Sequence, residues 1–173
     1  MDGTRRLLRH FLAALAYRTQ KALRSAPHSF GDFRAAPGVR TPHQLIHHMS
    51  GVLLFALSHF ENTETWVAQR GTLSQEVAAF HAVLEAIGRH LDAGTPFRGI
   101  TPERMLQGPL ADAMTHAGQL AMMRRLAGSP IPPEDFSKAD VLAENLGTDQ
   151  AAPRSPDADW RDAEGRQQRG DGS

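Results

Sequence analysis

The sequence predicts an all-α fold, an up-and-down bundle of four long helices in one domain. Four amphipathic segments, at about residues 4–25, 41–60, 73–93 and 109–127, carry apolar residues at helical spacing. Stretches that contain Pro and Gly separate these segments. The alternation of apolar and polar residues that is typical of strands is missing, and aromatic residues make up only 6% of the chain.

The first predicted helix begins at Thr4, a good N-cap residue. Its apolar stripe consists of Leu7, Leu8, Phe11, Leu12, Leu15 and Ala16. Several arginines lie off this stripe, but the chain has 19 Lys+Arg and 19 Asp+Glu and therefore no net charge. This balance favours a solvated outer face over a surface for nucleic acid or lipid.

The second predicted helix begins with Thr41 as its cap and Pro42 at its first position. It contains three histidines, His43, His47 and His48. His48 lies three residues after Leu45 and borders the apolar face, whereas His43 and His47 are four residues apart on one flank. From the spacing, the pair on the flank can bind a metal ion together, or all three can be solvated helix histidines.

A polar connection over residues 61–71 precedes the third predicted helix, and we expect Trp66 to anchor this connection to the bundle. Thr72 or Ser74 is the expected cap of the helix. His81, on this helix, shows no pattern of partners, and we expect it to be exposed.

The last predicted helix has Pro109 at its first position and Gly128 directly after its end. Asp112 and His116 are four residues apart on this helix, so they face the same way, one turn apart. Two ligand-type side chains at that spacing can hold one metal ion. In the alternative interpretation, Asp112 complements the helix dipole and His116 is a hydrogen-bonded core histidine.

The segment Thr115-His116-Ala117-Gly118-Gln119-Leu120, followed by Arg124-Arg125-Leu126-Ala127-Gly128, resembles the last bundle helix of the DinB-like (damage-inducible, YfiT-like) family. That family has a four-helix bundle with a divalent metal held by three side chains. One His comes from the second helix, and a His-x-x-x-His pair comes from the last. The resemblance covers about residues 4–128.

The resemblance implies a ligand set of His48, Asp112 and His116. His48, within Leu45-Ile46-His47-His48-Met49, matches the family's second-helix ligand, and His116 matches the second His of the pair. Asp112 stands where the first His of the pair is usual, and a carboxylate also binds divalent metals. The implied cofactor is a divalent ion of Zn, Ni, Fe or Mn.

The resemblance also implies a function and an assembly. Relatives include metal- and thiol-dependent transferases, so we expect a transferase or hydrolase that acts on small electrophilic substrates, with a low-molecular-weight thiol as partner. The chain has no cysteine, so any thiol must come from outside. The alternatives are a non-catalytic, metal-stabilised protein with a binding or stress-associated role, and a degenerate member without metal. Wide apolar helix faces and the resemblance together predict a homodimer.

The end of the chain changes in character after the last predicted helix. A Pro-rich extension leads into a segment that is expected to pack on the bundle, which gives a domain of residues 1–147. Residues 148–173 are polar and rich in Pro, Gly and charge, and are predicted to be a disordered tail in which Trp160 is the exception. The absence of cysteine, of a signal-like start and of a long apolar run predicts a cytoplasmic protein with no membrane or nucleic-acid partner.

Overall fold

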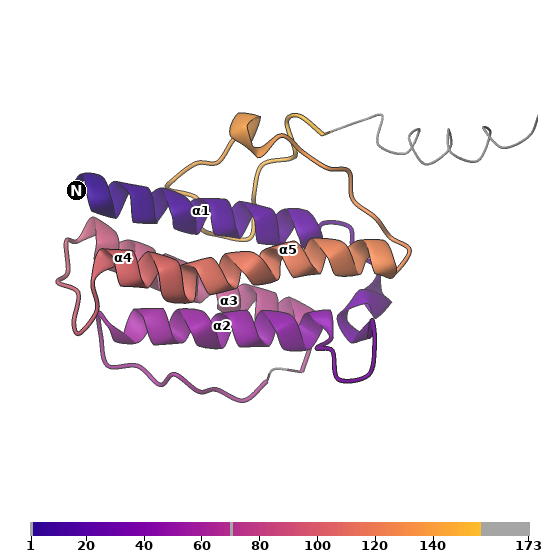
Figure 1. Ribbon diagram of the computed structural model, residues 1–173, viewed down its shortest axis with the longest axis horizontal. Helices are drawn as coiled ribbons and strands as arrows, with labels where there is room; N and C mark the ends of the chain where they lie inside the picture. Colours follow the sequence, from indigo (N-terminus) through magenta and orange to yellow (C-terminus); the bar gives the residue numbers. More distant parts are fainter. Residues whose placement is uncertain (1, 70, 157–173) are drawn as a thin grey trace, which may run out of the picture.

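The computed structural model describes residues 2–69 and 71–156, whose regular elements are helices joined by irregular connections, without a strand among the described residues. Four long helices lie side by side (Figure 1): α1 (Gly3–Leu23), α2 (Pro42–Ser58), α3 (Leu73–Asp92) and α5 (Ala111–Leu126). Shorter helical elements are η1 (His28–Asp32), α4 (Pro102–Met105), η2 (Leu106–Leu110) and η3 (Phe136–Lys138). The all-α prediction is confirmed, and each long helix begins and ends within two residues of its predicted bounds.

The directions of the helices differ from the predicted up-and-down order. His47, near the start of α2, contacts Glu76 in the first turn of α3. At the other end of these helices, Phe60 stacks on His90, with 5.3 Å between ring centroids. α2 and α3 are therefore parallel neighbours. The up-and-down prediction is wrong because the connection over residues 59–72 runs back along the bundle, so that α3 starts at the end where α2 starts (Figure 1).

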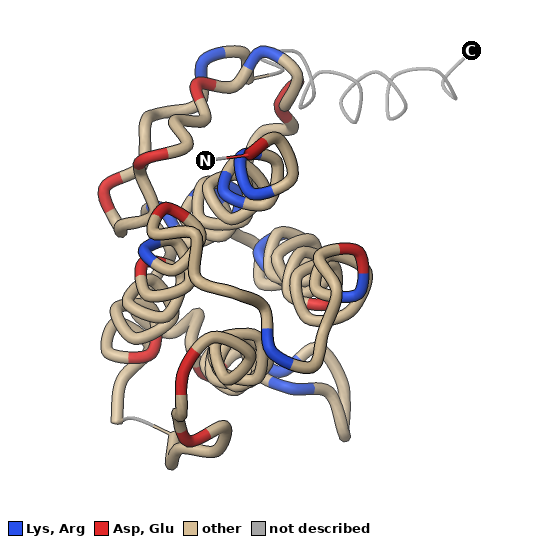
Figure 2. The backbone as a smooth tube through the Cα atoms, turned by 90° about the vertical axis from the view of Figure 1, so that its left-hand side faces the viewer, with Lys and Arg blue, Asp and Glu red and all other residues tan. Residues whose placement is uncertain are grey.

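α1 and α5 form a second parallel pair. Arg124, near the end of α5, donates hydrogen bonds to the backbone oxygens of Ala22 and Arg24 at the end of α1. α1 packs against α3 and α5, and α2 packs against the same two helices, so α1 and α2 occupy opposite corners. Figure 2, which looks along the bundle, shows the four helices around one centre.

The structure contains the side-chain caps from which the starts of the second and third helices were predicted. Thr41 accepts a hydrogen bond from the backbone N–H of Gln44, whose side chain accepts one from the Thr41 N–H. Thr72 repeats this capping box at α3. Each box satisfies two N–H groups that a helix start leaves unpaired. α1 starts one residue earlier than predicted because Asp2, and not Thr4, is its N-cap.

All four long helices contribute apolar side chains to one core. The largest fully buried side chains are Tyr17, Phe30, Phe80, Leu12, Leu15, Ile46, Met49, Leu53, Leu84, Ile87, Leu91 and Met105. Burial of a side chain of this size stabilises the fold by about 1.5–3 kcal/mol. This packing fixes α2 and α5 relative to each other, which matters because these two helices carry the predicted metal ligands.

Residues 129–156 pack back on the bundle and bury side chains beneath them. Leu146 is 2% exposed, and its Cδ1 would lie 2.6 Å from a Cβ placed on Gly88 of α3. His81 is also 2% exposed, so the prediction that it is exposed is wrong. Its Nδ1 lies 2.6 Å from the Leu146 oxygen and must donate, so Nε2 accepts from the Gln20 amide at 2.9 Å.

The predicted disordered tail begins too early at residue 148. Gln150 is buried, and Arg24 donates hydrogen bonds to the backbone oxygens of Gln150 and Ala151. Residues 157–173, with Trp160, lie outside the described residues. Within the described part of the chain, no helix combines the length and the apolar character needed to cross a membrane.

Candidate metal site

A kink before α5 sets the start of the helix that carries two candidate ligands. Gly108 has φ −90° and ψ −106°, which is not helical, and Pro109 follows it with no N–H to leave unpaired. The kink turns the chain out of the short α4–η2 segment into α5. Asp112 then falls in the first turn of α5, and His116 lies one turn further on.

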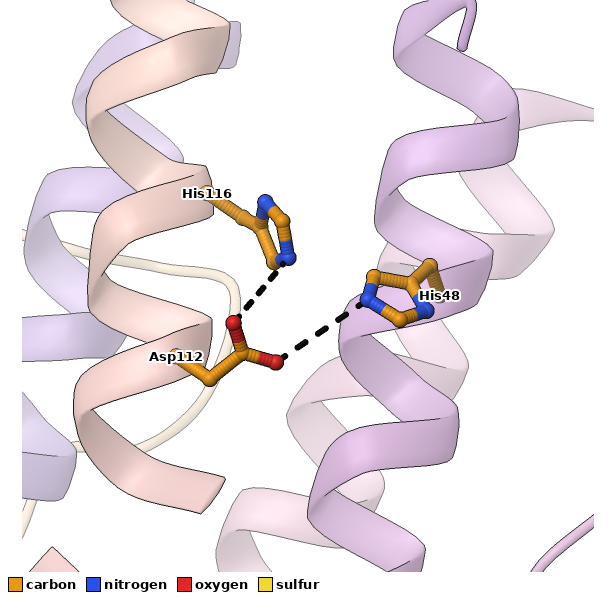
Figure 3. A group of neighbouring side chains, drawn as sticks. All are labelled: His48, Asp112 and His116. Atoms are coloured by element: carbon orange, nitrogen blue, oxygen red, sulfur yellow. Dashed lines mark ion pairs between the residues drawn. The ribbon is translucent and has the colours of Figure 1, made fainter. Parts of the chain in front are cut away.

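The structure brings together the three residues His48, Asp112 and His116 that the sequence analysis singled out. The Asp112 carboxylate lies between the two imidazoles (Figure 3). Its Oδ1 is 3.4 Å from His116 Nε2, and its Oδ2 is 3.9 Å from His48 Nε2. One ligand atom from each residue lies within 4.8 Å of the others. His48 reaches the cluster from α2, so the site joins two helices that are far apart in the sequence.

These distances distinguish the cluster from a simple hydrogen-bonded triad. Both contacts exceed the 2.7–3.2 Å that is typical of a nitrogen–oxygen hydrogen bond. Ligands about 2.1 Å from a tetrahedral metal ion lie about 3.4 Å from one another. The His116–Asp112 distance of 3.4 Å equals that spacing, and the contact to His48 is about half an ångström longer. All the ligand atoms lie within 4.8 Å of one another, so side-chain movements of about 1 Å would bring the three groups around one ion.

A neighbouring amide fixes the tautomer of His116. His116 Nδ1 lies 2.8 Å from Gln119 Oε1, which can only accept, so Nδ1 carries the proton. Nε2 then presents its lone pair to Asp112 and His48. Metal-binding histidines commonly use the other ring nitrogen in this way, so the contact is compatible with His116 as a ligand.

The surroundings of His48 favour its neutral form, the form that binds metal. Burial lowers the pKa of His48, the positive charge of Arg40 and the neighbouring His116 lower it further, and the Asp112 carboxylate opposes them. A neutral imidazole has a lone pair for a cation, whereas an imidazolium has none.

The cluster lies at the wall of an open cleft of about 1150 Å³. Helix α2, residues 65–69 and the start of α5 line this cleft, and His48 and Asp112 are among the lining residues. Phe55 and Trp66 also line it, with 48% and 76% of their surfaces exposed. The prediction of Trp66 as an anchor is therefore wrong. The sequence carries no signal of this cleft, because the far wall of the cleft is an irregular connection without a periodic pattern.

The alternative metal pair, His43 and His47, does not form a site of three ligands among the described residues. His47 Nδ1 lies 3.2 Å from Oε1 of Glu76, whose side chain is fully buried on α3. Gly118 lies two residues after His116 on α5, and a Cβ placed on it would meet no neighbouring element within 4 Å. A crossing next to the metal site does not explain this glycine.

The fold and the cluster define an all-α protein in which two histidines and one aspartate could hold a metal ion. Comparison of the chain with protein-family models, with curated proteins and with solved structures finds no match in any of the three. The function of the site must therefore be argued from its own geometry and chemistry.

Proposed function

We propose that this protein binds one divalent metal ion through His48, Asp112 and His116, in the manner of the DinB-like family that its last helix resembles. The observation that carries this proposal is the convergence of the three side chains from α2 and α5 at the wall of an open cleft. The cleft leaves room on the ion for a ligand from solution.

The donor set fits such an ion. Two imidazole nitrogens and a carboxylate oxygen are common ligands of Zn, Fe, Mn and Ni. The Gln119 contact orients His116, and the lowered pKa of His48 keeps its lone pair available. Three protein ligands beside an open position are typical of catalytic rather than structural metal sites.

We further propose that the reaction is a transfer or hydrolysis on a small electrophilic substrate, with an external thiol or water as nucleophile. A divalent ion supplies Lewis-acid chemistry, which lowers the pKa of such a nucleophile. The chain contains no cysteine and therefore contributes no thiol of its own. The Asp112 carboxylate reduces the net charge of the loaded site from +2 to +1, so acidification is weaker than with three histidines.

Metal stoichiometry measured by native mass spectrometry, on protein purified without a histidine tag, tests the metal site. We expect one ion per chain in the wild type and strong loss in Asp112→Asn and His116→Ala. His43→Ala is the matched control, because His43 lies on α2 outside the cluster, and it should keep its metal. Unchanged metal content in both Asp112→Asn and His116→Ala would refute the proposed site.

A separate assay distinguishes the enzyme from a non-catalytic metal protein. The loaded protein is mixed with glutathione and 1-chloro-2,4-dinitrobenzene, and then with other small thiols, and consumption of the electrophile is followed. A rate that disappears in His116→Ala supports catalysis. Absence of a metal-dependent rate with every thiol supports the non-catalytic alternative, because a metal that joins α2 to α5 stabilises the bundle without turnover.

We also propose that the protein forms a homodimer. Met122 and Leu126 of α5 are 64% and 60% exposed, and they lie one turn apart on the same helix. Apolar side chains grouped in this way are a common feature of interfaces. Light scattering at micromolar concentrations should give twice the chain mass, and Met122→Glu should give a monomer; a wild-type monomer refutes the dimer.

A further inference from the structure

The described residues that line the cleft include one residue of each charge. Arg40 is the one Lys or Arg among the described lining residues, and Asp112 is the one Asp or Glu. Asp112 belongs to the candidate metal cluster, where the proposed ion would take up its charge. Arg40 is exposed, and no described residue forms an ion pair or hydrogen bond with its side chain. The cleft therefore contains a guanidinium with its hydrogen-bond donors available.

A metal ion increases the positive charge of the cleft. A divalent ion with the Asp112 carboxylate contributes +1, and Arg40 contributes another +1. Arg40 lines the same cleft as His48 and Asp112 of the cluster. No other described carboxylate among the lining residues offsets this charge. An anion thus gains electrostatic free energy in this cleft, and a guanidinium can hold a carboxylate with two parallel hydrogen bonds.

One exposed aromatic side chain of the cleft, Phe55, lies beyond His48 from Arg40 along α2. Phe55 is seven residues beyond His48 on α2, or about 10 Å along the axis, whereas Arg40 precedes the helix, which begins at Pro42, six residues or about 9 Å before His48. Trp66, on the opposite wall, is 76% exposed. Exposed aromatic side chains in a cleft commonly contact planar or apolar parts of a ligand. Along α2, His48 of the candidate metal site therefore lies between Arg40 at one end and Phe55 at the other.

We infer that the cleft binds an elongated organic anion, with its carboxylate at Arg40 and its aromatic part against Trp66 and Phe55. This inference rests on the proposed metal site, because it places the middle of the ligand at the ion. Arg40 and the aromatic side chains determine specificity, and the metal ligands do not. A neutral ligand of the same shape lacks the guanidinium contact and binds more weakly.

Isothermal titration with a matched pair of probes tests this inference. The probes are 4-(biphenyl-4-yl)butanoate and its primary amide, which share a shape and differ in charge. We expect the wild type to bind the carboxylate at least tenfold more tightly than the amide. Arg40→Gln should remove this preference, and Trp66→Ala should weaken both probes several-fold. Arg6→Gln, an exposed arginine on α1 away from the cleft, is the charge-matched control and should behave as the wild type.

The titrations are done on metal-loaded and on chelator-treated protein, with metal content measured in each variant. Equal binding of the two probes to the wild type, or unchanged carboxylate binding in Arg40→Gln, overturns the inference whatever the metal result. Loss of the carboxylate preference in Arg40→Gln with full metal content supports it. If the proposed metal site is wrong, a separate measurement shows it: the metal content is then unchanged in Asp112→Asn and His116→Ala.

Discussion

Replacement of Arg124 by Met should remove a buried connection between the ends of α1 and α5. The Arg124 side chain is enclosed, with the residue 3% exposed. Its guanidinium donates to the backbone oxygens of Ala22 and Arg24 at 3.1 and 3.0 Å. It also donates to the backbone oxygen and the hydroxyl of Ser129, at 2.9 and 3.0 Å. Met keeps most of the apolar stem and removes every one of these donors.

The expected loss in the free energy of unfolding follows from the acceptors that Arg124→Met leaves without a donor. Three backbone oxygens lose a charged donor, and each buried polar group left unpaired costs about 1–3 kcal/mol. Water reaches some of them at the helix ends, so we expect Arg124→Met to lower the free energy of unfolding by about 3–5 kcal/mol. Arg124→Lys should lose about half as much, because one ammonium cannot reach all four acceptors.

Urea denaturation at pH 7, followed by the helical circular dichroism signal, measures these losses. Arg6→Met is the control, since Arg6 is exposed on α1, and it should change the free energy of unfolding by less than about 0.5 kcal/mol. A loss of less than about 1 kcal/mol in Arg124→Met would refute the reasoning, because it would mean that water satisfies these oxygens as well as the arginine does.

Three further predictions concern two glycines, the buried His81 and the extension. Gly88→Ala should destabilise the fold by about 1–3 kcal/mol because of the clash with the extension, whereas Gly118→Ala should stabilise α5 by up to about 1 kcal/mol; thermal melting compares the two variants. Burial lowers the pKa of His81 below its usual 6.5, so the native state favours the neutral ring, and stability should fall as the pH falls below about 6.5. Urea midpoints at pH 7 and pH 5 should differ less in His81→Gln than in the wild type; an equal difference would contradict this. A chain that ends at Thr148 loses the buried Gln150 and should melt several degrees lower, and an unchanged melting temperature would count against packing of this segment.

Local signals in the sequence predicted the helices and the cluster. Thr41 and Thr72 mark helix starts because a hydroxyl cap satisfies backbone groups within its own turn, whatever the rest of the chain does. Asp112 and His116 share a face because helix geometry requires it, so one contact from α2 completed the cluster. The family resemblance selected His48 as this third ligand. The spacing of residues within α2 alone also allowed His43 and His47 to bind a metal.

The features that the sequence did not predict depend on long-range packing. A connection of 14 residues, 59–72, can extend about 45 Å, which exceeds the length of α2 of about 26 Å, so it permits a parallel neighbour as well as a hairpin. His81 is buried because Leu146, 65 residues later, returns to cover it. Trp66 stays exposed because its connection forms one wall of a cleft.

The parallel pairs place like ends of helix dipoles beside each other, which is unfavourable unless a charge offsets it. At one end of the bundle, Arg124 brings a buried positive charge to the negative ends of α1 and α5. At the same end, the buried carboxylate of Glu76 lies in the first turn of α3 and contacts His47 in the early part of α2, near the positive ends of both helices. If α3 ran in the opposite direction, Glu76 would lie next to the negative end of α2. Arg124 and Glu76 therefore place opposite charges where the two parallel pairs need them, and Glu76 favours this direction of α3 over the reverse one.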